Sequence, residues 1–260
     1  MTRVHEHLVE TRQGSVATLR IDREEALGAL SRDMVAGLGD YFRAVRGSDI
    51  RVLVLTGTGR GFVAGADVGE YAHASRAEFD AYQRLSRSVF GELEQLPQPT
   101  IAAVNGYALG GGFELALCCD FIVASTAARF GLPEVKLGLT PGGGGTQRLA
   151  RAIGTRATKE LVLTGRVIRP DEAQRRGLLT QVMEPDELVP HVAGFAAELA
   201  GHAPLAIREA KRLIDDGVQQ PLDVALTAEQ AALGRLFDSE DGREGIAAFL
   251  EKRDPRFTGR

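Results

Sequence analysis

The chain has 260 residues, of which 44% are hydrophobic and 25% are charged, so it is long enough to bury a sizeable core in one or two globular domains. Its net charge is −4 and its pI is near 5.8. This charge argues against a nucleic-acid-binding protein, because phosphate binding needs a basic surface.

The N-terminus and the cysteines both bear on the compartment. Residues 1–14 lack the apolar core of a signal peptide, and no window approaches the ~18 apolar residues that a membrane span requires. The only cysteines, Cys118 and Cys119, are adjacent in an apolar stretch, which favours buried reduced thiols over a disulfide. We expect a soluble cytoplasmic protein with no membrane or nucleic-acid partner.

The first half of the chain alternates strand-like and helix-like patterns. Residues 14–21 alternate as a strand does. A helix capped by Ser31 would carry its apolar residues on one face, namely Met34, Leu38, Tyr41, Phe42 and Val45. Residues 51–56 and 100–104 are typical of buried strands, and a polar helix is predicted over 76–96. This alternation indicates an α/β domain with a largely parallel sheet.

The pattern changes after about residue 185. Strand signals disappear, and the remaining sequence predicts four helices, at 186–201, 203–217, 221–237 and 241–252. We therefore divide the chain into an α/β core, residues 1–185, and a helical C-terminal region, residues 186–260. Four helices cannot easily bury all their apolar faces against one neighbouring sheet, so we expect this region to associate with other subunits.

Three glycine-rich stretches, 57–61, 106–112 and 142–145, interrupt the α/β part. None has the spacing of a dinucleotide fingerprint or a P-loop. Residues 110–112 directly precede a predicted helix, where glycines expose free N–H groups and the helix dipole favours negative charge. Such donors form an oxyanion hole, although a tight turn with close backbone packing would have the same glycine triplet.

Two glutamates near these glycines are candidates for acid–base chemistry. Glu114 falls in the first turn of the predicted helix, where the alternative is a surface carboxylate that complements the helix dipole. Glu134 follows Pro133 in a loop, where the alternative is an ion pair with Lys136 or an arginine. Two carboxylates near one oxyanion site would supply a general base and a general acid, but their spacing in the sequence does not show that they meet.

Other catalytic patterns do not occur. The five histidines are scattered, and no cluster has metal-ligand spacing. The G-x-S-x-G pattern of serine hydrolases is missing as well. We expect no metal site.

Five blocks of the sequence, in order along the chain, resemble the signature stretches of the crotonase (enoyl-CoA hydratase/isomerase) family: 62–67, 101–116, 130–134, 141–147 and 244–253. The resemblance covers nearly the whole chain and is closest to the enoyl-CoA hydratases. It implies a spiral of ββα units with two roughly perpendicular sheets. It also implies that the C-terminal helices drive assembly into homotrimers, or homohexamers made of two trimers.

The resemblance implies a role for each candidate group. The N–H groups of Ala66 and Gly111 would hold the thioester oxygen of an acyl-CoA substrate while it becomes an enolate. Glu134 would deliver a proton to Cα, Glu114 would deprotonate the water that attacks Cβ, and Gly142 would hold that water through its backbone. Glutamates at both positions favour syn hydration of trans-2-enoyl-CoA to 3-hydroxyacyl-CoA, as in fatty-acid β-oxidation, without a metal or redox cofactor.

The same resemblance assigns five residues to substrate and CoA binding: Ala26, Leu27, Ala64, Asp67 and Lys252. Backbone groups of the first two would border the adenine, and the lysine would reach the CoA phosphates from its own or a neighbouring subunit. The chain departs from the family pattern here, because Glu24 replaces a proline and Gly28 replaces an asparagine. An acid at position 24 would weaken phosphate binding.

Two alternatives remain at this stage. Δ3-Δ2-enoyl-CoA isomerisation, or another enolate reaction, would use the same site, since some family members with two glutamates also isomerise. A non-catalytic acyl-CoA-binding or RNA-binding scaffold would keep only the fold. The acidic pI counts against RNA, and the intact set of site residues counts against an inert scaffold.

Overall fold

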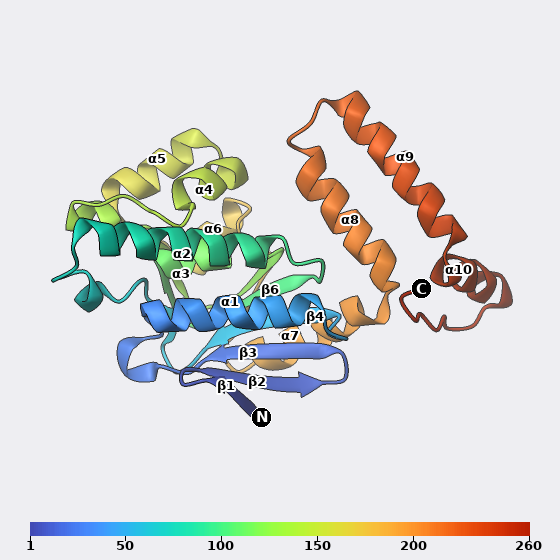
Figure 1. Ribbon diagram of the computed structural model, residues 1–260, viewed down its shortest axis with the longest axis horizontal. Helices are drawn as coiled ribbons and strands as arrows, with labels where there is room; N and C mark the ends of the chain where they lie inside the picture. Colours follow the sequence, from blue (N-terminus) through green and yellow to red (C-terminus); the bar gives the residue numbers. More distant parts are fainter.

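The computed structural model describes residues 1–260 as two β-sheets with ten α-helices (Figure 1). The larger sheet has the strand order β1-β2-β3-β4-β6-β8-β10, and the smaller one has the order β5-β7-β9. The antiparallel strands come first along the chain: β1 (Thr2–His5), β2 (Leu8–Gln13) and β3 (Val16–Ile21). All other pairings between these strands are parallel, so the predicted α/β class is confirmed.

Three successive strand pairs each place one strand in each sheet. The strands in the larger sheet are β4 (Val52–Gly57), β6 (Thr100–Val104) and β8 (Phe121–Ser125). Their partners in the smaller sheet are β5 (Gly61–Val63), β7 (Tyr107–Leu109) and β9 (Arg129–Gly131). Helices α2 (Arg76–Glu94) and α3 (Gly111–Ala116) follow the first two pairs. This is the spiral of ββα units that the family resemblance implied.

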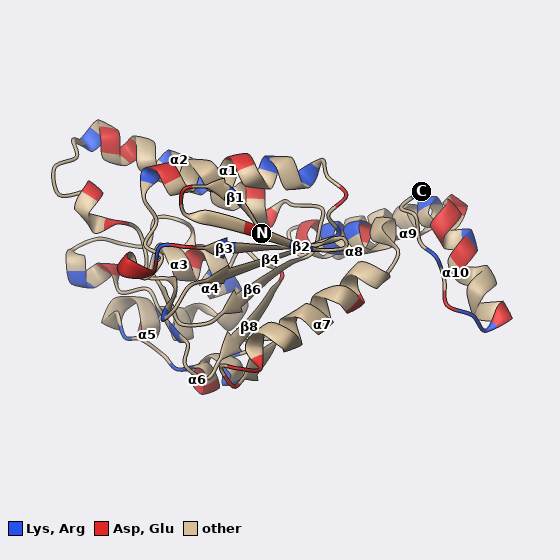
Figure 2. Ribbon diagram, turned by 90° about the horizontal axis from the view of Figure 1, so that it is seen from below, with Lys and Arg blue, Asp and Glu red and all other residues tan.

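Side chains of the larger sheet alternate between two apolar layers. Leu53 and Leu55 of β4 join the main core with α2 and with α1 (Arg32–Arg46). Val52 and Val54 join a second cluster formed with α7 (Leu188–Gly201). Figure 2 shows α1 and α2 on one side of the sheet and α7 on the other. A strand buried on both faces reads as a continuous apolar run, which explains the pattern at 51–56.

The long predicted helices are confirmed, together with their starting signals. Ser31 Oγ accepts a hydrogen bond from Met34 N at 3.2 Å, so Ser31 caps α1 as expected. Ser75 and Glu78 form a capping box at the start of α2. The short elements were not predicted: η1 (Glu24–Ala26), η2 (Val68–Glu70), η3 (Glu134–Leu137), α4 (Gly145–Ile153), α5 (Thr155–Thr164), α6 (Pro170–Arg175) and β10 (Gln181–Met183).

The last three helices form an arm that projects from the core (Figure 1). They are α8 (Pro204–Gly217), α9 (Leu222–Asp238) and α10 (Glu240–Glu251). The division at residues 185/186 stays a prediction, and α7, which lies beyond it, packs against the sheet. Large apolar side chains are exposed along the arm: Ile214, Val218, Leu222, Leu233, Phe237, Phe249 and Leu250. No helix of the chain is both long and apolar enough to cross a bilayer.

Burial in the central strand predicts the cost of a cavity there. Leu53 of β4 is fully buried, whereas Leu163 of α5 is 70% exposed. Leu53→Ala should lower the free energy of unfolding by about 3 kcal/mol, since a large buried side chain is removed, and the matched change Leu163→Ala should cost about 0.5 kcal/mol or less. Urea denaturation measures both, and equal losses would contradict the packing described.

Candidate active site

Two backbone amides meet where the loop after β5 approaches the start of α3. A Cβ added to Gly111, the first residue of α3, would lie 3.7 Å from Ala66 N. Leu30 N donates to Gly65 O and Asp67 N donates to Leu30 O, each at 2.8 Å. This bridge holds the loop while the N–H groups of Ala66 and Gly111 donate to no protein acceptor. Two free, adjacent donors are what an oxyanion hole requires.

Glycine is required on both sides of this meeting point. Gly110 has φ 50° and ψ −125°, a conformation that a side chain would strain. Gly112 packs so closely on the backbone of Val63 that a Cβ would overlap the Val63 carbonyl. The glycine triplet therefore permits both the turn and the close approach of α3 to β5, so the two interpretations of the triplet are compatible.

Glu114 is buried, with 3% of its surface exposed, in the first turn of α3. Its Oε1 accepts a hydrogen bond of 2.7 Å from Gly145 N, the first amide of α4. Burial raises the pKa of Glu114, and the amides of Gly145 and Gly143 and the charge of Arg148 act in the opposite direction. The carboxylate therefore lies inside the molecule at the positive end of α4, which excludes the surface alternative.

Glu134 lies beside the same loops and forms no ion pair with Lys136. A Cβ on Gly110 would lie 3.1 Å from Glu134 Oε1, and Glu134 Oε2 is buried without a hydrogen-bond partner. Burial raises the pKa of the Glu134 carboxyl to about 7, and the nearby charge of Glu114 also raises it. A carboxyl of this kind holds or releases a proton near neutral pH.

The structure thus gathers four of the five predicted catalytic groups around one point. Gly110 connects them, because it contacts Glu134 on one side and precedes Gly111 on the other. Glu114 follows one helical turn later and is electrostatically coupled to Glu134. Two carboxyls with differently tuned pKa values beside an anion-binding pair of amides can transfer protons to and from an enolate. The individual roles stay predictions.

The fifth group, Gly142, is exposed in the loop before α4, where α2 forms the opposite wall. A Cβ on Gly142 would collide with Oε1 of Gln83, and a Cβ on Gly143 would lie 2.7 Å from both Glu114 Oε2 and Phe90 Cε2. Gln83 and Phe90 both belong to α2. Helix α2 therefore borders the site.

The residues assigned to CoA binding fall into two groups. Ala26 ends η1, and Leu27 caps it in the left-handed region at φ 51°. Ala64 N donates to Leu27 O at 3.0 Å, so these residues adjoin the loop that carries Ala66. The carboxylate of Asp67 accepts a hydrogen bond of 2.8 Å from Arg23 Nη2. Asp67 therefore braces this loop, and its contact with CoA stays a prediction.

Lys252 lies apart from these residues. It caps α10 with φ 55° and is exposed, and α10 lies in the projecting arm, well away from α3 (Figure 1). Its own chain does not bring it to the site. A role in phosphate binding would require the site of a neighbouring subunit.

Sequence reasoning missed several residues that shape the site. Arg23, Gln83, Gly145 and Arg148 were not singled out, although Gly145 belongs to a glycine run that was noted. The available signal was that this run precedes a helix and so offers free amides to a carboxylate. No three His, Cys, Asp or Glu side chains form a group that could hold a metal ion. Whether the protein needs a metal stays a prediction.

Comparison with known proteins identifies the family. A family model described as enoyl-CoA hydratase/isomerase matches residues 11–260. The chain belongs to the enoyl-CoA hydratase/isomerase family. This confirms the resemblance drawn from the five sequence blocks.

Similar proteins match nearly its full length. The chain is 42% identical to the crotonyl-CoA hydratase of Syntrophomonas wolfei, over 97% of this chain and 98% of that protein. It is also 42% identical to the short-chain-enoyl-CoA hydratase of Clostridium acetobutylicum, over 95% of each. The crystal structure of an enoyl-CoA hydratase from Bacillus anthracis superimposes with a TM-score of 0.96 at 37% identity, covering 98% of this chain and 100% of that one. The fold is therefore that of this family's hydratases.

The burial of Glu134 predicts an unusual titration. Its carboxyl should be half-protonated near pH 7, mostly protonated at lower pH and mostly ionised at higher pH. Carbon-13 NMR of the glutamate carboxyl groups measures this titration, and the spectrum of Glu134→Gln identifies the Glu134 signal. Glu114→Gln should lower the pKa of Glu134 because a nearby negative charge is lost, whereas Glu229→Gln on exposed α9 should not. A Glu134 carboxyl that titrates near the ordinary ~4.3 would contradict its placement.

Proposed function

We propose that the chain is an enoyl-CoA hydratase that adds water to trans-2-enoyl-CoA, giving 3-hydroxyacyl-CoA, as in fatty-acid β-oxidation. The observation that carries this proposal is the coupled pair Glu114 and Glu134 beside two free amides. The names of the relatives support the same reaction, since they are a crotonyl-CoA hydratase and a short-chain-enoyl-CoA hydratase. Short acyl chains are therefore the first substrates to test.

Polarisation of the thioester is the first requirement. The N–H groups of Ala66 and Gly111 are adjacent and free, so both can donate to one thioester oxygen. As water attacks Cβ, negative charge moves through Cα to this oxygen, and the donors stabilise the enolate more than the substrate. Loss of one such donor typically costs about 3 kcal/mol in the barrier.

Proton transfer is the second requirement. Glu114 as carboxylate takes one proton from the attacking water, whose oxygen bonds to Cβ. Glu134 as neutral acid gives its proton to Cα, and its raised pKa of about 7 keeps a proton available at neutral pH. Afterwards Glu114 is protonated and Glu134 ionised, and exchange with solvent restores the starting state. Every group that the reaction needs is on the chain, so we propose that no metal or redox cofactor takes part.

The projecting arm supports assembly through α8, α9 and α10. Its exposed apolar side chains, such as Leu233 and Phe249, at 67% and 83% exposed, would be costly to leave in water. We propose a homotrimer or a dimer of trimers, in which an arm covers a neighbouring subunit and Lys252 reaches its CoA.

The cysteines bear on the compartment. Cys118 and Cys119 are both free thiols, which supports our proposal that the protein is located in the reducing cytoplasm.

Activity tests the proposed reaction. The purified protein should consume crotonyl-CoA, with loss of the conjugated thioester absorbance and formation of 3-hydroxybutyryl-CoA. Glu114→Gln and Glu134→Gln should each lower kcat by about 10²-fold or more, and the double variant should lose less than the product of the two losses, because the residues act as a unit.

A panel of substrates separates the alternatives. A protein that shifts the double bond of 3-enoyl-CoA but hydrates no 2-enoyl-CoA of any chain length would be an isomerase. Tight binding of CoA esters with no turnover of any of them would make it a scaffold. Either result would refute hydration.

Solution mass tests the assembly. Light scattering should give three or six times the 27.8 kDa of one chain. Leu233→Asp on α9 should shift the population to smaller species, because it places a charge on an apolar interface. Leu163→Asp serves as the matched control, because Leu163 on α5 is similarly exposed. A monomeric parent protein would refute the proposed assembly. It would not bear on the proposed hydration, which the activity assay tests separately.

A further inference from the structure

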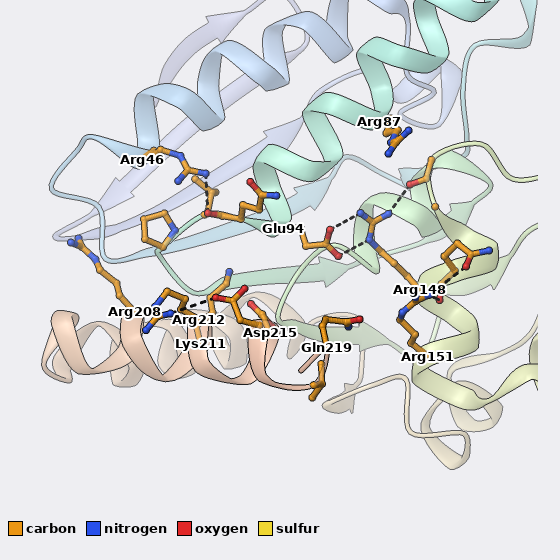
Figure 3. Close-up of a pocket in the computed structure, with 18 of the residues that line it drawn as sticks. Arg46, Arg87, Glu94, Arg148, Arg151, Arg208, Lys211, Arg212, Asp215 and Gln219 are labelled. Carbon is orange, nitrogen blue, oxygen red and sulfur yellow. Dashed lines mark hydrogen bonds and ion pairs between the residues drawn. The ribbon is translucent and has the colours of Figure 1, made fainter. Parts of the chain in front are cut away.

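The glycine loop that carries Gly145 is held from behind by an arginine. Behind the loop is a cleft of about 1120 Å³ that separates it and the end of α2 from α8. Arg148, on α4, and Glu94, the last residue of α2, both line this cleft and contact each other. Its Nε and Nη2 donate to the two carboxylate oxygens of Glu94, each at 2.7 Å. Figure 3 shows this paired contact, which has the geometry of a strong, directional ion pair.

The third contact of the same guanidinium reaches the loop. Arg148 Nη1 donates to the carbonyl of Gly143 at 2.7 Å. A Cβ on Gly144 would collide with this nitrogen, so only glycine lets the guanidinium lie against the backbone. All three donor nitrogens of Arg148 are thus engaged, and its side chain is mostly buried.

The loop transmits this restraint to Glu114. Gly143 lies against Glu114 Oε2 and Phe90, and Gly145 donates to Glu114 Oε1. A continuous path therefore runs from Glu94 through Arg148 and the loop to the buried carboxylate. A rotation of the 143–145 backbone would change the direction of the hydrogen bond to Glu114.

The charged and titratable groups around Glu114 come from four places. Burial raises the pKa of Glu114, and the charge of Arg148 on α4 acts against this rise. Glu134 of η3 is close enough for the charge of Glu114 to raise its pKa. Cys118, one turn after Glu114, is a thiol whose pKa burial raises to about 12, so it is neutral near pH 7. Glu94 acts through Arg148, which it partly neutralises. Arg148 is the only cation among these groups.

We propose that Arg148, braced by Glu94, is a positioning residue for Glu114: it fixes the glycine loop that aims the carboxyl group. This inference rests on the proposed function only in naming Glu114 as the base. Burial raises the pKa of both glutamates, to about 7 in Glu134, but only for Glu114 does a cation, Arg148, act against the rise.

Kinetics of variants at both ends of the pair test this inference. Arg148→Gln should lower kcat for crotonyl-CoA by about 10²-fold through misplacement of the base, with little change in KM. It should also move the acidic limb of the kcat/KM profile to higher pH, because Glu114 loses a nearby cation. Arg148→Lys keeps the positive charge but loses the paired hydrogen bonds to Glu94. Its acidic limb should therefore stay in place, and its kcat should lie between those of the parent protein and Arg148→Gln.

Glu94→Gln should shift the acidic limb in the opposite direction, to lower pH. The amide leaves Arg148 in place but no longer neutralises it, so the pKa of Glu114 falls. Arg151→Gln is the matched control, because Arg151 is on the same helix, lines the same cleft and bonds only to Gln147. Opposite shifts are a result that a purely structural role for the pair would not produce.

Titration separates this inference from the proposed reaction. The pKa of Glu114, followed by carboxyl carbon-13 NMR and assigned with Glu114→Gln, should rise in Arg148→Gln and fall in Glu94→Gln, whatever reaction the protein catalyses. An unmoved Glu114 pKa in both folded variants would overturn the inference even if hydration stands. If Arg148→Gln does not fold, the direction of the shift in Glu94→Gln, whose carboxylate is half-exposed, decides between the two outcomes by itself.

Discussion

The burial of one carboxylate at the start of a short helix is the constraint on which the site depends. Glu114 lies buried on α3, and Gly145 N–H and the positive end of the α4 dipole face its carboxyl group. That arrangement requires the glycine loop to pass directly over the carboxylate. The loop in turn requires Arg148 and Glu94 to hold it from behind. The position of the Glu114 carboxyl therefore depends on backbone groups of the glycine loop, which are held in turn by the side chains of Arg148 and Glu94.

The ββα spiral explains why these backbone groups meet. In each unit, the short strand of the smaller sheet ends near the same point, so that β5 leads to Ala66, β7 to Gly111 and β9 to Glu134. Because β5, β7 and β9 are parallel neighbours, the segments that follow them leave from the same edge of the sheet. One sheet edge thus collects two amides and an acid from distant parts of the sequence, as the ends of parallel strands commonly do.

Much of this could be predicted from the sequence, and the remainder could not for physical reasons. The helix capped by Ser31 and the apolar strand at 51–56 have clear local signals, and both formed as expected. The three-residue strands of the smaller sheet are too short to show any periodicity, so the second sheet followed only from the family resemblance. Glu114 and Glu134 were predicted as acid–base residues from their positions beside glycine-rich stretches. Their closeness in space, which lets the charge of Glu114 raise the pKa of Glu134, depends on tertiary packing. The Arg148–Glu94 pair joins residues 54 positions apart, and no local pattern records such a contact.

A structure with a bound thioester tests the central claim most directly. Crystals of the protein with acetoacetyl-CoA, whose thioester oxygen carries enolate character, should place that oxygen about 3 Å from both Ala66 N and Gly111 N. Its Cα should face Glu134 and its Cβ should face Glu114. A thioester oxygen bound away from these two amides, or an acyl group with the two carboxyls on remote sides, would contradict the account.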